Sequence, residues 1–311
     1  MYLTNKLYLI LLVGLAGCFE QDIPVQPKPR LSKTRFLDAG ETKQLVNYYS
    51  SKEDTILAQI DPMTWDIGYR NGILFFNGFR SMQAAPFKSE WKDVKDTSGL
   101  NFDYLTVGYP DNMWQLNANQ NYVLEFGYDQ EYKSLGLYKF FFSETDIDII
   151  FRISKIDGKD EREIALSKGD FHYSFLAENY TEVPFEEEYD IALGKYTDFV
   201  IFPDEQSNYL VYGALLGNTM ARELRVPYED VGSSSLDTLD FDHRLRTTIG
   251  WDWKYYSLSD GAYSLREDMT FVLKTDEEFY YKLRFVDFYN QDGISGHPTL
   301  EIGRAWCRDR V

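Results

Sequence analysis

The C-terminal part of the chain alternates apolar and polar side chains with a period of two. Tyr281, Leu283 and Phe285 occupy every second position, and Lys282 and Arg284 lie between them. Successive side chains of a β-strand point to opposite faces, so this alternation predicts a sheet with one buried and one solvated face. This feature constrains the fold most, because a helix would not place these three apolar side chains on one face.

The neighbouring residues predict an antiparallel β-meander over residues 251–303. A short apolar strand is expected at 271–274, and a polar turn at 275–278 separates it from the alternating strand. A closing strand is expected at 299–302, after turns rich in Asn, Gly, Ser and Pro.

Similar patterns extend along most of the chain, and helical periodicity of any length is absent. The fold class is therefore predicted to be all-β or nearly so, with antiparallel meanders forming a sandwich or a barrel-like fold. Asn71 and Gly72 predict a two-residue hairpin turn, because both residues tolerate positive φ. Further strands are expected at 43–50, 55–60, 65–69, 73–76, 104–107, 122–126, 137–142, 147–153, 171–175, 189–193, 197–202 and 209–216.

A short internal similarity raises the question of two related modules. Residues 65–70 (WDIGYR) resemble residues 189–194 (YDIALG), and each segment follows a proline by a few positions. The β-rich region, residues 36–303, is read either as sub-modules 36–150 and 151–303 or as one enlarged sandwich, and the sequence leaves both open. Residues 304–311 are expected to form a tail.

The N-terminus predicts export and lipid attachment. Residues 1–17 contain the basic Lys6 and an apolar stretch too short to span a bilayer, as is typical of a signal peptide. The stretch ends in the tetrapeptide LAGC, which matches the bacterial lipoprotein cleavage box, so Cys18 is expected to carry acyl chains such as palmitate. An ordinary secretory signal with a chance cysteine is the alternative. The proline-rich segment 18–35 is expected to be a flexible or extended tether.

The charge of the chain argues against nucleic-acid binding. The formal net charge is −18 and the sequence pI is about 4.6. Such a surface repels phosphate backbones, and the simplest interpretation is a solvated acidic surface without a charged partner.

No compact catalytic motif is present, so a non-enzymatic protein is predicted. The nucleophile elbow, the Walker loop, the dinucleotide fingerprint and HExxH are all absent. His172, His243 and His297 are isolated, and none has zinc-ligand spacing from another His or Cys. Asp146 and Asp148 would share one face of a strand, but such a pair lacks the number of oxygens that Ca²⁺ requires.

A further set of motifs comes from both ends of the β-rich region. They are WDI at 65–67, the strand containing Trp253, FVLKT at 271–275, YKLRFVDFY at 281–289 and GHPT at 296–299. These motifs resemble the HmuY family of haem-binding lipoproteins from Bacteroidetes-type bacteria. The resemblance covers about residues 48–106 and 245–302, and the lipoprotein box and proline-rich tether agree with it.

The resemblance implies a β-rich protein attached to the outer membrane, at its periplasmic face or at the cell surface. It also implies that haem is a candidate cofactor, since some members bind it through two axial side chains, a His pair or Met. Here the family's C-terminal histidine position, five residues after Trp253, falls on Leu258, which cannot ligate iron.

Three other residues are candidate haem ligands. Met82 lies in a loop expected at 77–86, Met220 follows a Gly-Asn pair, and His243 precedes the strand that contains Trp253. Thioether and imidazole groups both bind haem iron. The alternative for each is a packed methionine or a surface histidine.

Three functions therefore remain open. The first is a haem-binding lipoprotein, with the membrane as a partner through acylated Cys18 and with haem or a haem-carrying protein as a second partner. The second is a non-enzymatic β-scaffold that binds a protein or another ligand without haem. The third is a hydrolase with an unrecognised carboxylate site.

Overall fold

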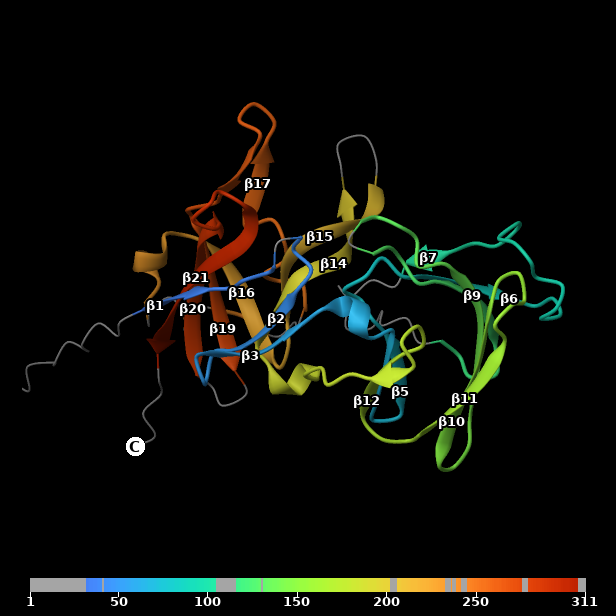
Figure 1. Cartoon of the computed structure of the whole chain (residues 1–311). Coiled ribbons are helices and arrows are strands. Elements are labelled where there is room, and N and C mark those ends of the chain that lie inside the picture. Colours follow the sequence, from blue (N-terminus) through green and yellow to red (C-terminus); the bar gives the residue numbers. More distant parts are fainter. Residues whose placement is uncertain are drawn as a thin grey trace, which may run out of the picture. The chain divides into compact units, whose positions relative to one another are not determined.

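A computed structural model describes residues 32–40, 42–104, 116–129, 131–201, 206–232, 236, 239–241, 245–275 and 279–306. Within them, the secondary structure is almost wholly antiparallel β, as predicted, in four larger sheets and one separate hairpin (Figure 1). None of the helices in these residues has the length and apolarity that crossing a bilayer requires.

The first pair of sheets contains both the first and the last described strands. Its five-stranded sheet has the order β1 (Lys33–Phe36), β21 (Ser295–Trp306), β20 (Tyr280–Tyr289), β19 (Met269–Thr275) and β16 (Thr219–Arg225). Its four-stranded sheet has the order β15 (Gln206–Leu216), β14 (Ile191–Ile201), β2 (Val46–Ser50) and β3 (Thr55–Ile60). Leu193 from the second sheet and Phe271 and Leu283 from the first belong to one buried cluster, so the two sheets are the layers of a sandwich.

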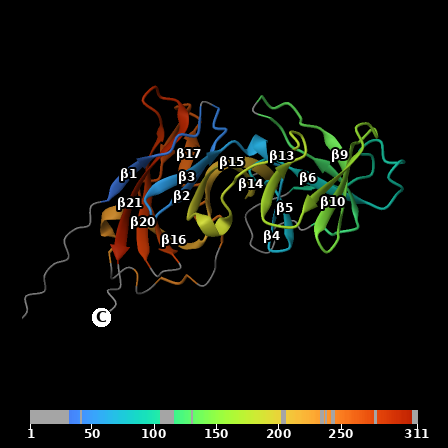
Figure 2. The same cartoon turned by 60° about the horizontal axis from the view of Figure 1, so that its bottom comes forward.

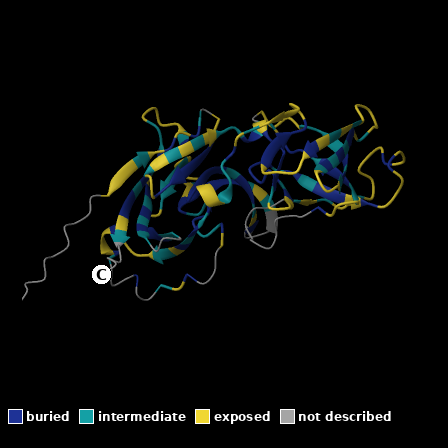
Figure 3. Cartoon of the chain, turned by 90° about the horizontal axis from the view of Figure 1, so that it is seen from below, coloured by how far each residue is buried: buried dark blue, intermediate teal, exposed yellow. Residues whose placement is uncertain are grey.

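The second pair of sheets is built from the middle of the chain. Its six-stranded sheet has the order β11 (Arg162–Ser167), β10 (Asp148–Lys155), β9 (Leu137–Glu144), β8 (Asn121–Glu125), β6 (Gln83–Phe87) and β7 (Asp103–Tyr104). Its four-stranded sheet has the order β13 (Asn179–Tyr180), β12 (Phe171–Ser174), β4 (Ile67–Arg70) and β5 (Ile73–Phe76). Ile67, Phe140 and Phe151 share a second buried cluster. Figure 2 shows strands of the two sheets, among them β9 and β10 of one and β4 and β5 of the other. Figure 3 shows buried residues along the strands and exposed residues mainly in the connections.

Short elements complete the described structure. The separate hairpin is formed by β17 (Lys254–Ser257) and β18 (Ala262–Leu265), and the 3₁₀ turns are η1 (Pro62–Thr64), η2 (Glu186–Glu188) and η3 (Tyr228–Asp230). The turn η1 begins after Asp61, whose carboxylate accepts a 2.8 Å hydrogen bond from the Met63 amide. Just before β17, the Trp253 ring stacks on Phe285 with 3.7 Å between ring centroids, which fixes the start of the hairpin on the first core.

The strand orders of the two pairs of sheets correspond. In the four-stranded sheets β13-β12-β4-β5 corresponds to β3-β2-β14-β15, and in the larger sheets β6-β8-β9-β10-β11 corresponds to β16-β19-β20-β21-β1. Along the chain, β2 and β3 precede η1, β4 and β5, just as β12 and β13 precede η2, β14 and β15. β2 and β3, from the first half of the chain, therefore lie in the four-stranded sheet with β14 and β15. In the same way, β12 and β13, from the second half, lie in the sheet with β4 and β5.

Most predicted strands are present, and the differences have physical reasons. Asn71 and Gly72 connect β4 to β5 with φ of 51° and 81°, as expected for the hairpin turn. Where two strands were expected at 189–193 and 197–202, β14 is continuous through Gly194. A Cβ built on Gly194 would lie 2.8 Å from a methyl carbon of Val46, so this glycine allows the close approach of β2 instead of ending the strand.

Several predicted boundaries also shift. The loop expected at 77–86 is partly replaced by β6, which pairs with β8. The tether expected to reach residue 35 ends earlier, because β1 pairs with β21. β21 continues past residue 303, because it pairs there with β20. A module boundary at residue 150 would fall inside β10.

Candidate functional site

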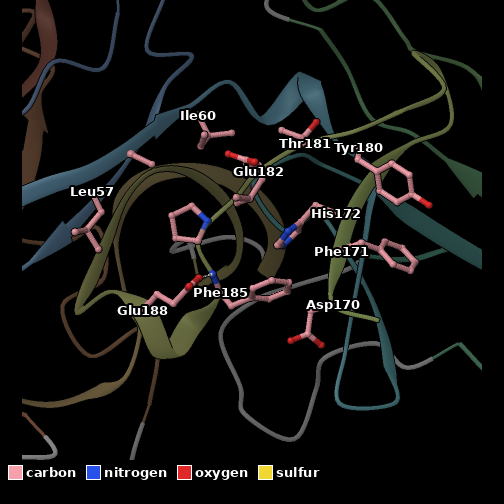
Figure 4. A pocket seen from close by; sticks show the side chains of 13 residues that line it. Leu57, Ile60, Asp170, Phe171, His172, Tyr180, Thr181, Glu182, Phe185 and Glu188 are labelled. Atoms are coloured by element: carbon pink, nitrogen blue, oxygen red, sulfur yellow. Dashed lines mark hydrogen bonds between the residues drawn. The ribbon is translucent and has the colours of Figure 1, made fainter. Parts of the chain in front are cut away.

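A pocket of about 950 Å³ lies where the edge strands β3 and β13 approach each other (Figure 4). This volume is within the range of small-molecule sites in proteins, roughly 300–1,000 Å³. The lining residues come from β3, from the start of β12 and the residue before it, and from the stretch that runs from β13 into η2. They are Leu57, Ala58, Ile60, Asp170, Phe171, His172, Tyr180, Thr181, Glu182, Val183, Pro184, Phe185 and Glu188.

The pocket borders the open edge of β3. Successive side chains of a strand point to opposite faces, yet the neighbouring Leu57 and Ala58 both line the pocket. A ligand at the open edge of β3 can contact both side chains. β3 pairs with β2 on its other side, and its outer edge has no strand partner within the described ranges.

His172 projects from β12 toward the middle of the pocket and is only 4% exposed (Figure 4). Aromatic rings surround it: Trp65 and Phe75 meet the imidazole edge to face at 4.7 and 5.7 Å between centroids, and Phe185 lies across it at 4.5 Å. Gly68 is paired with His172 across β4 and β12, and a Cβ on Gly68 would lie 2.2 Å from the Phe75 ring. The glycine therefore makes room for the ring that packs on His172.

The environment keeps His172 neutral. Burial, with a smaller contribution from the positive charge of Arg70, lowers the pKa of its imidazole to about 4. A neutral imidazole carries one N–H donor and one nitrogen acceptor. Within the described part of the chain, neither ring nitrogen makes a hydrogen bond, although the backbone carbonyl of His172 accepts one from Thr181.

The charged residues that line the pocket are all acidic. Asp170, Glu182 and Glu188 line it, and no Lys or Arg is among its described lining residues. Glu188 accepts a 2.6 Å hydrogen bond from the Phe185 amide and so fixes the turn that carries the Phe185 ring. Arg70 approaches this ring from outside the lining, with its guanidinium 4.1 Å from the ring centroid.

Arg70 holds the wall next to His172 in place. Its guanidinium lies 3.3 Å from a carboxylate oxygen of Glu187 in η2 and 3.7 Å from Asp170 before β12. These contacts connect β4 to the segment that carries Phe185. The cation of Arg70 is therefore balanced by two carboxylates.

Met82, a candidate haem ligand predicted from the sequence, lies outside this pocket. It is 0% exposed within the second core, and its sulphur is 3.6 Å from Nη2 of Arg80. The same Nη2 lies 2.7 Å from Oδ1 of Asp66, and both side chains of this ion pair are completely buried. To reach a ligand, the Met82 thioether would have to leave the core.

Met220 is half-buried at the surface of the first pair of sheets. It belongs to a cross-strand row in which Met220 pairs with Lys274 and Lys274 pairs with Tyr280. The Phe241 ring packs over this row, with its centroid 5.9 Å from Lys274 Nζ and 5.9 Å from the Tyr280 ring centroid. Met220 and Phe241 contact the same apolar cluster.

The remaining predicted positions are separate from the pocket. His243 lies outside the described residues, as does Cys18. Leu258 is 91% exposed in the loop between β17 and β18. His297 lies on β21, where Nδ1 is 3.1 Å from a carboxylate oxygen of Asp38 and the ring stacks with Phe36.

Of the two predicted thioether donors, Met82 is enclosed in a core, whereas Met220 is half-buried. Met82 and Met220 belong to different clusters, so the described residues do not bring them together. Met220 is half-buried and lies beside the segment that leads to His243. One thioether and one imidazole together form a known axial pair for haem iron. Within the described ranges, no group of three or more His, Cys, Asp and Glu residues could hold a metal ion.

Sequence reasoning did not single out His172 as a site residue. The rings that enclose it come from other segments: Trp65 and Phe75 lie far before His172 in the chain, and Phe185 lies beyond β13. A weak signal is present in residues 171–175, where Phe171, Tyr173 and Phe175 alternate with His172 and Ser174. This pattern places the histidine on the opposite face of β12 from the aromatic core, but it does not reveal the pocket.

The comparison with protein families decides where the chain belongs. Residues 41–302 match the family model described as HmuY protein. The chain belongs to the HmuY family. Its all-β architecture and the motifs at both ends of the β-rich region agree with this assignment.

Solved structures also resemble this HmuY-family chain. One is a "putative HmuY_like heme binding protein" from Bacteroides vulgatus, with 9% identity, a TM-score of 0.28 and coverage of 91% of this chain and 97% of that one. Apo PinO from Porphyromonas gingivitis has 9% identity, a TM-score of 0.30 and coverage of 90% and 99%. A "putative lipoprotein" from Bacteroides fragilis has 12% identity, a TM-score of 0.25 and coverage of 47% and 79%. With TM-scores this low, these likenesses carry no functional inference. A comparison with curated proteins finds no match.

Proposed function

We propose that this HmuY-family chain is a lipid-anchored envelope protein that binds haem, with Met220 and His243 as the axial donors. The observation that carries the proposal is the packing of Phe241 over the row that contains Met220. The Phe241 ring contacts Lys274 and Tyr280, the neighbours of Met220 in this row.

Chain connectivity supports the choice of the second donor. His243 is two residues from Phe241, and two residues of extended chain span at most about 7 Å. The Met220 thioether supplies a soft donor from a rigid strand, and the His243 imidazole supplies the second donor. When bound, haem would contribute iron coordination, whose potential the thioether and imidazole together adjust.

Lipid attachment and location belong to the same proposal. Cys18 in the LAGC box is the acylation site, and residues 19–31 connect it to the first described strand. Acyl chains would hold the protein in the outer membrane, since each buried CH₂ contributes about 0.8 kcal/mol. Membership of the HmuY family supports this assignment, and haem or a haem-carrying protein is the proposed partner.

An absorption titration tests haem binding. The chain starting after Pro29 is titrated with haemin, and we expect a sharp Soret shift that saturates at one equivalent. Met220→Ala and His243→Ala should each weaken binding by about tenfold or more and change the spectrum, because each removes one iron ligand. Met63→Ala and His297→Ala are matched controls outside the proposed donor pair and should leave the spectrum unchanged.

The alternative is a β-scaffold of the same family that binds a protein or another ligand without haem. The observation in its favour is Leu258, whose fully hydrocarbon side chain occupies the position that the resemblance assigns to a histidine. A haemin spectrum identical to that of free haemin would overturn the haem proposal and favour this alternative. Unchanged haem binding in both donor variants would overturn the assignment of the donors.

A further inference from the structure

We propose that the pocket around His172 is a second binding site, which takes a small organic cation with an aromatic body and a hydroxyl group. The site is separate from the proposed haem donors. No residue of the cluster around Met220 and Phe241 lines the pocket, and no residue that lines the pocket belongs to that cluster. The inference therefore does not depend on haem binding.

The walls of the pocket match a flat apolar body. Leu57, Ala58 and Ile60 from β3 line the pocket, and so do Val183, Pro184 and Phe185 from the segment before η2. Figure 4 shows Leu57, Ile60 and Phe185 around the pocket. Small-molecule sites combine such apolar walls with a few well-placed polar groups.

His172 supplies the polar group in the interior. Its side chain is almost completely buried and lines the pocket, and its nitrogens make no hydrogen bond within the described part of the chain. Buried polar groups are nearly always hydrogen-bonded, to protein groups or to water. A ligand hydroxyl that reaches the imidazole would complete this missing interaction.

The acidic groups that line the pocket select for positive charge. Asp170, Glu182 and Glu188 line it, without a lysine or arginine among the described lining residues. Nearby Arg70 contacts Asp170 and Glu187, and Arg246 lies 2.6 Å from Glu186, so the neighbouring cations already have carboxylate partners. An ammonium group at the mouth is therefore favoured, and a carboxylate there is disfavoured.

The proposal is tested with three matched probes and the complete mature chain. Tyramine carries an aromatic ring, an ammonium and a hydroxyl; phenethylamine lacks the hydroxyl; and 4-hydroxyphenylacetate replaces the ammonium with a carboxylate. Calorimetry gives the affinities, and NMR of the imidazole resonances reports whether His172 is at the site. We expect tyramine to bind at one equivalent, about 3- to 10-fold more tightly than phenethylamine and at least about 10-fold more tightly than 4-hydroxyphenylacetate.

Two variants test the contribution of His172 and the contribution of the acidic residues Asp170 and Glu182 separately. In His172→Phe, tyramine and phenethylamine should bind equally, because the partner of the hydroxyl is gone. The double variant Asp170→Asn/Glu182→Gln should weaken tyramine about three- to fivefold, since two exposed charges are removed. Glu163→Gln on exposed β11 is the control and should leave all affinities unchanged.

The contrary results are equally definite. Binding of 4-hydroxyphenylacetate as tight as that of tyramine would overturn the charge selection. An unchanged advantage of tyramine in His172→Phe, or no binding of any probe, would overturn the site. If His172→Phe does not fold, the Asp170→Asn/Glu182→Gln variant still decides the outcome, because it leaves the aromatic packing in place.

Discussion

Asp66 and Asp190 make the same set of hydrogen bonds in two different sheets. The amide of Asp66 donates to the carbonyl of Tyr173 at 2.8 Å, and the amide of Asp190 donates to the carbonyl of Tyr49 at 2.9 Å. Each carboxylate accepts a 2.6 Å hydrogen bond from the backbone amide two residues beyond that tyrosine. Each backbone carbonyl accepts one from the residue that follows the adjacent strand, β5 or β15.

This equivalence explains the short similarity between residues 65–70 and 189–194. Together with the corresponding strand orders, it leads us to infer two structural repeats that exchange their first three strands, β1–β3 and β11–β13. Because β11 corresponds to β1, the boundary falls between β10 and β11. Trp251 and Asp252 repeat the order of Trp65 and Asp66, but the Asp252 side chain is half-exposed and lies 3.9 Å from Arg225.

The strand exchange predicts that neither half folds alone. Residues 32–160 lack β11, β12 and β13, and residues 161–306 lack β1, β2 and β3, so each four-stranded sheet would lose half of its strands. We expect both fragments to be unfolded separately by circular dichroism and to form a complex when they are co-expressed. A cooperative unfolding transition in either isolated fragment would contradict the exchange.

The buried pair of Asp66 and Arg80 should be critical for stability. Replacing Asp66 with Asn leaves the guanidinium of Arg80 buried without its counter-ion, which costs about 3–5 kcal/mol. Urea unfolding of Asp66→Asn, Arg80→Met and the double variant measures this cost and the coupling between the two residues. The double variant should recover part of the loss, since it removes both charges. Simple additivity of the two single variants would contradict the pairing.

Lys254 should make stability rise with pH. Its Nζ donates to the carbonyls of Tyr212 and Trp251 at 2.6 and 3.2 Å, and burial, with a smaller contribution from the charge of Lys43, lowers its pKa to about 7. Between pH 7 and the ordinary pKa of lysine, near 10.4, the unfolded chain holds a proton that the folded chain does not, so stability increases with pH across this window.

A substitution tests whether Lys254 causes this dependence of stability on pH. Lys254→Met should remove up to about 1.4 kcal/mol per pH unit from the slope of the unfolding free energy between pH 7 and 9.5. Lys88→Met, at an exposed position, is the control. The free energy of unfolding is measured with urea at several pH values. Equal slopes for wild type and Lys254→Met would show that Lys254 is not the group responsible.

Cys18 should determine membrane attachment. In cells that process lipoproteins, we expect the native chain in the outer-membrane fraction and Cys18→Ala in the soluble fraction, because the variant has no thiol to acylate. Labelling with a palmitate analogue checks the modification directly. Membrane association that is unchanged in Cys18→Ala would contradict lipid anchoring.

The sequence predicted the fold where the signal is local. The alternation of Tyr281, Leu283 and Phe285 and the turn at Asn71 and Gly72 both correspond to observed elements, since each depends on neighbouring residues. The pairing of β1 with β21 and the exchange of strands between the halves depend on contacts between distant segments, and no local pattern encodes them.

The site was harder to predict for the same reason. The small residues around Met82 predict a loop, but β6 begins immediately after it, and Nη2 of Arg80 lies beside its sulphur inside the core. The alternation around His172 was visible, but its environment depends on Trp65 and Phe185 from other parts of the chain. His243 stays a prediction.

The most direct test of the proposed function is the identity of the iron ligands. Magnetic circular dichroism of the ferric haem complex, prepared at one equivalent, distinguishes a thioether–iron bond from a pair of nitrogen ligands. We predict a low-spin spectrum with a thioether signature. Met220→Ala should lose the thioether signature, and His243→Ala should lose low-spin character. A spectrum without a thioether contribution, or one that neither substitution changes, would contradict the account.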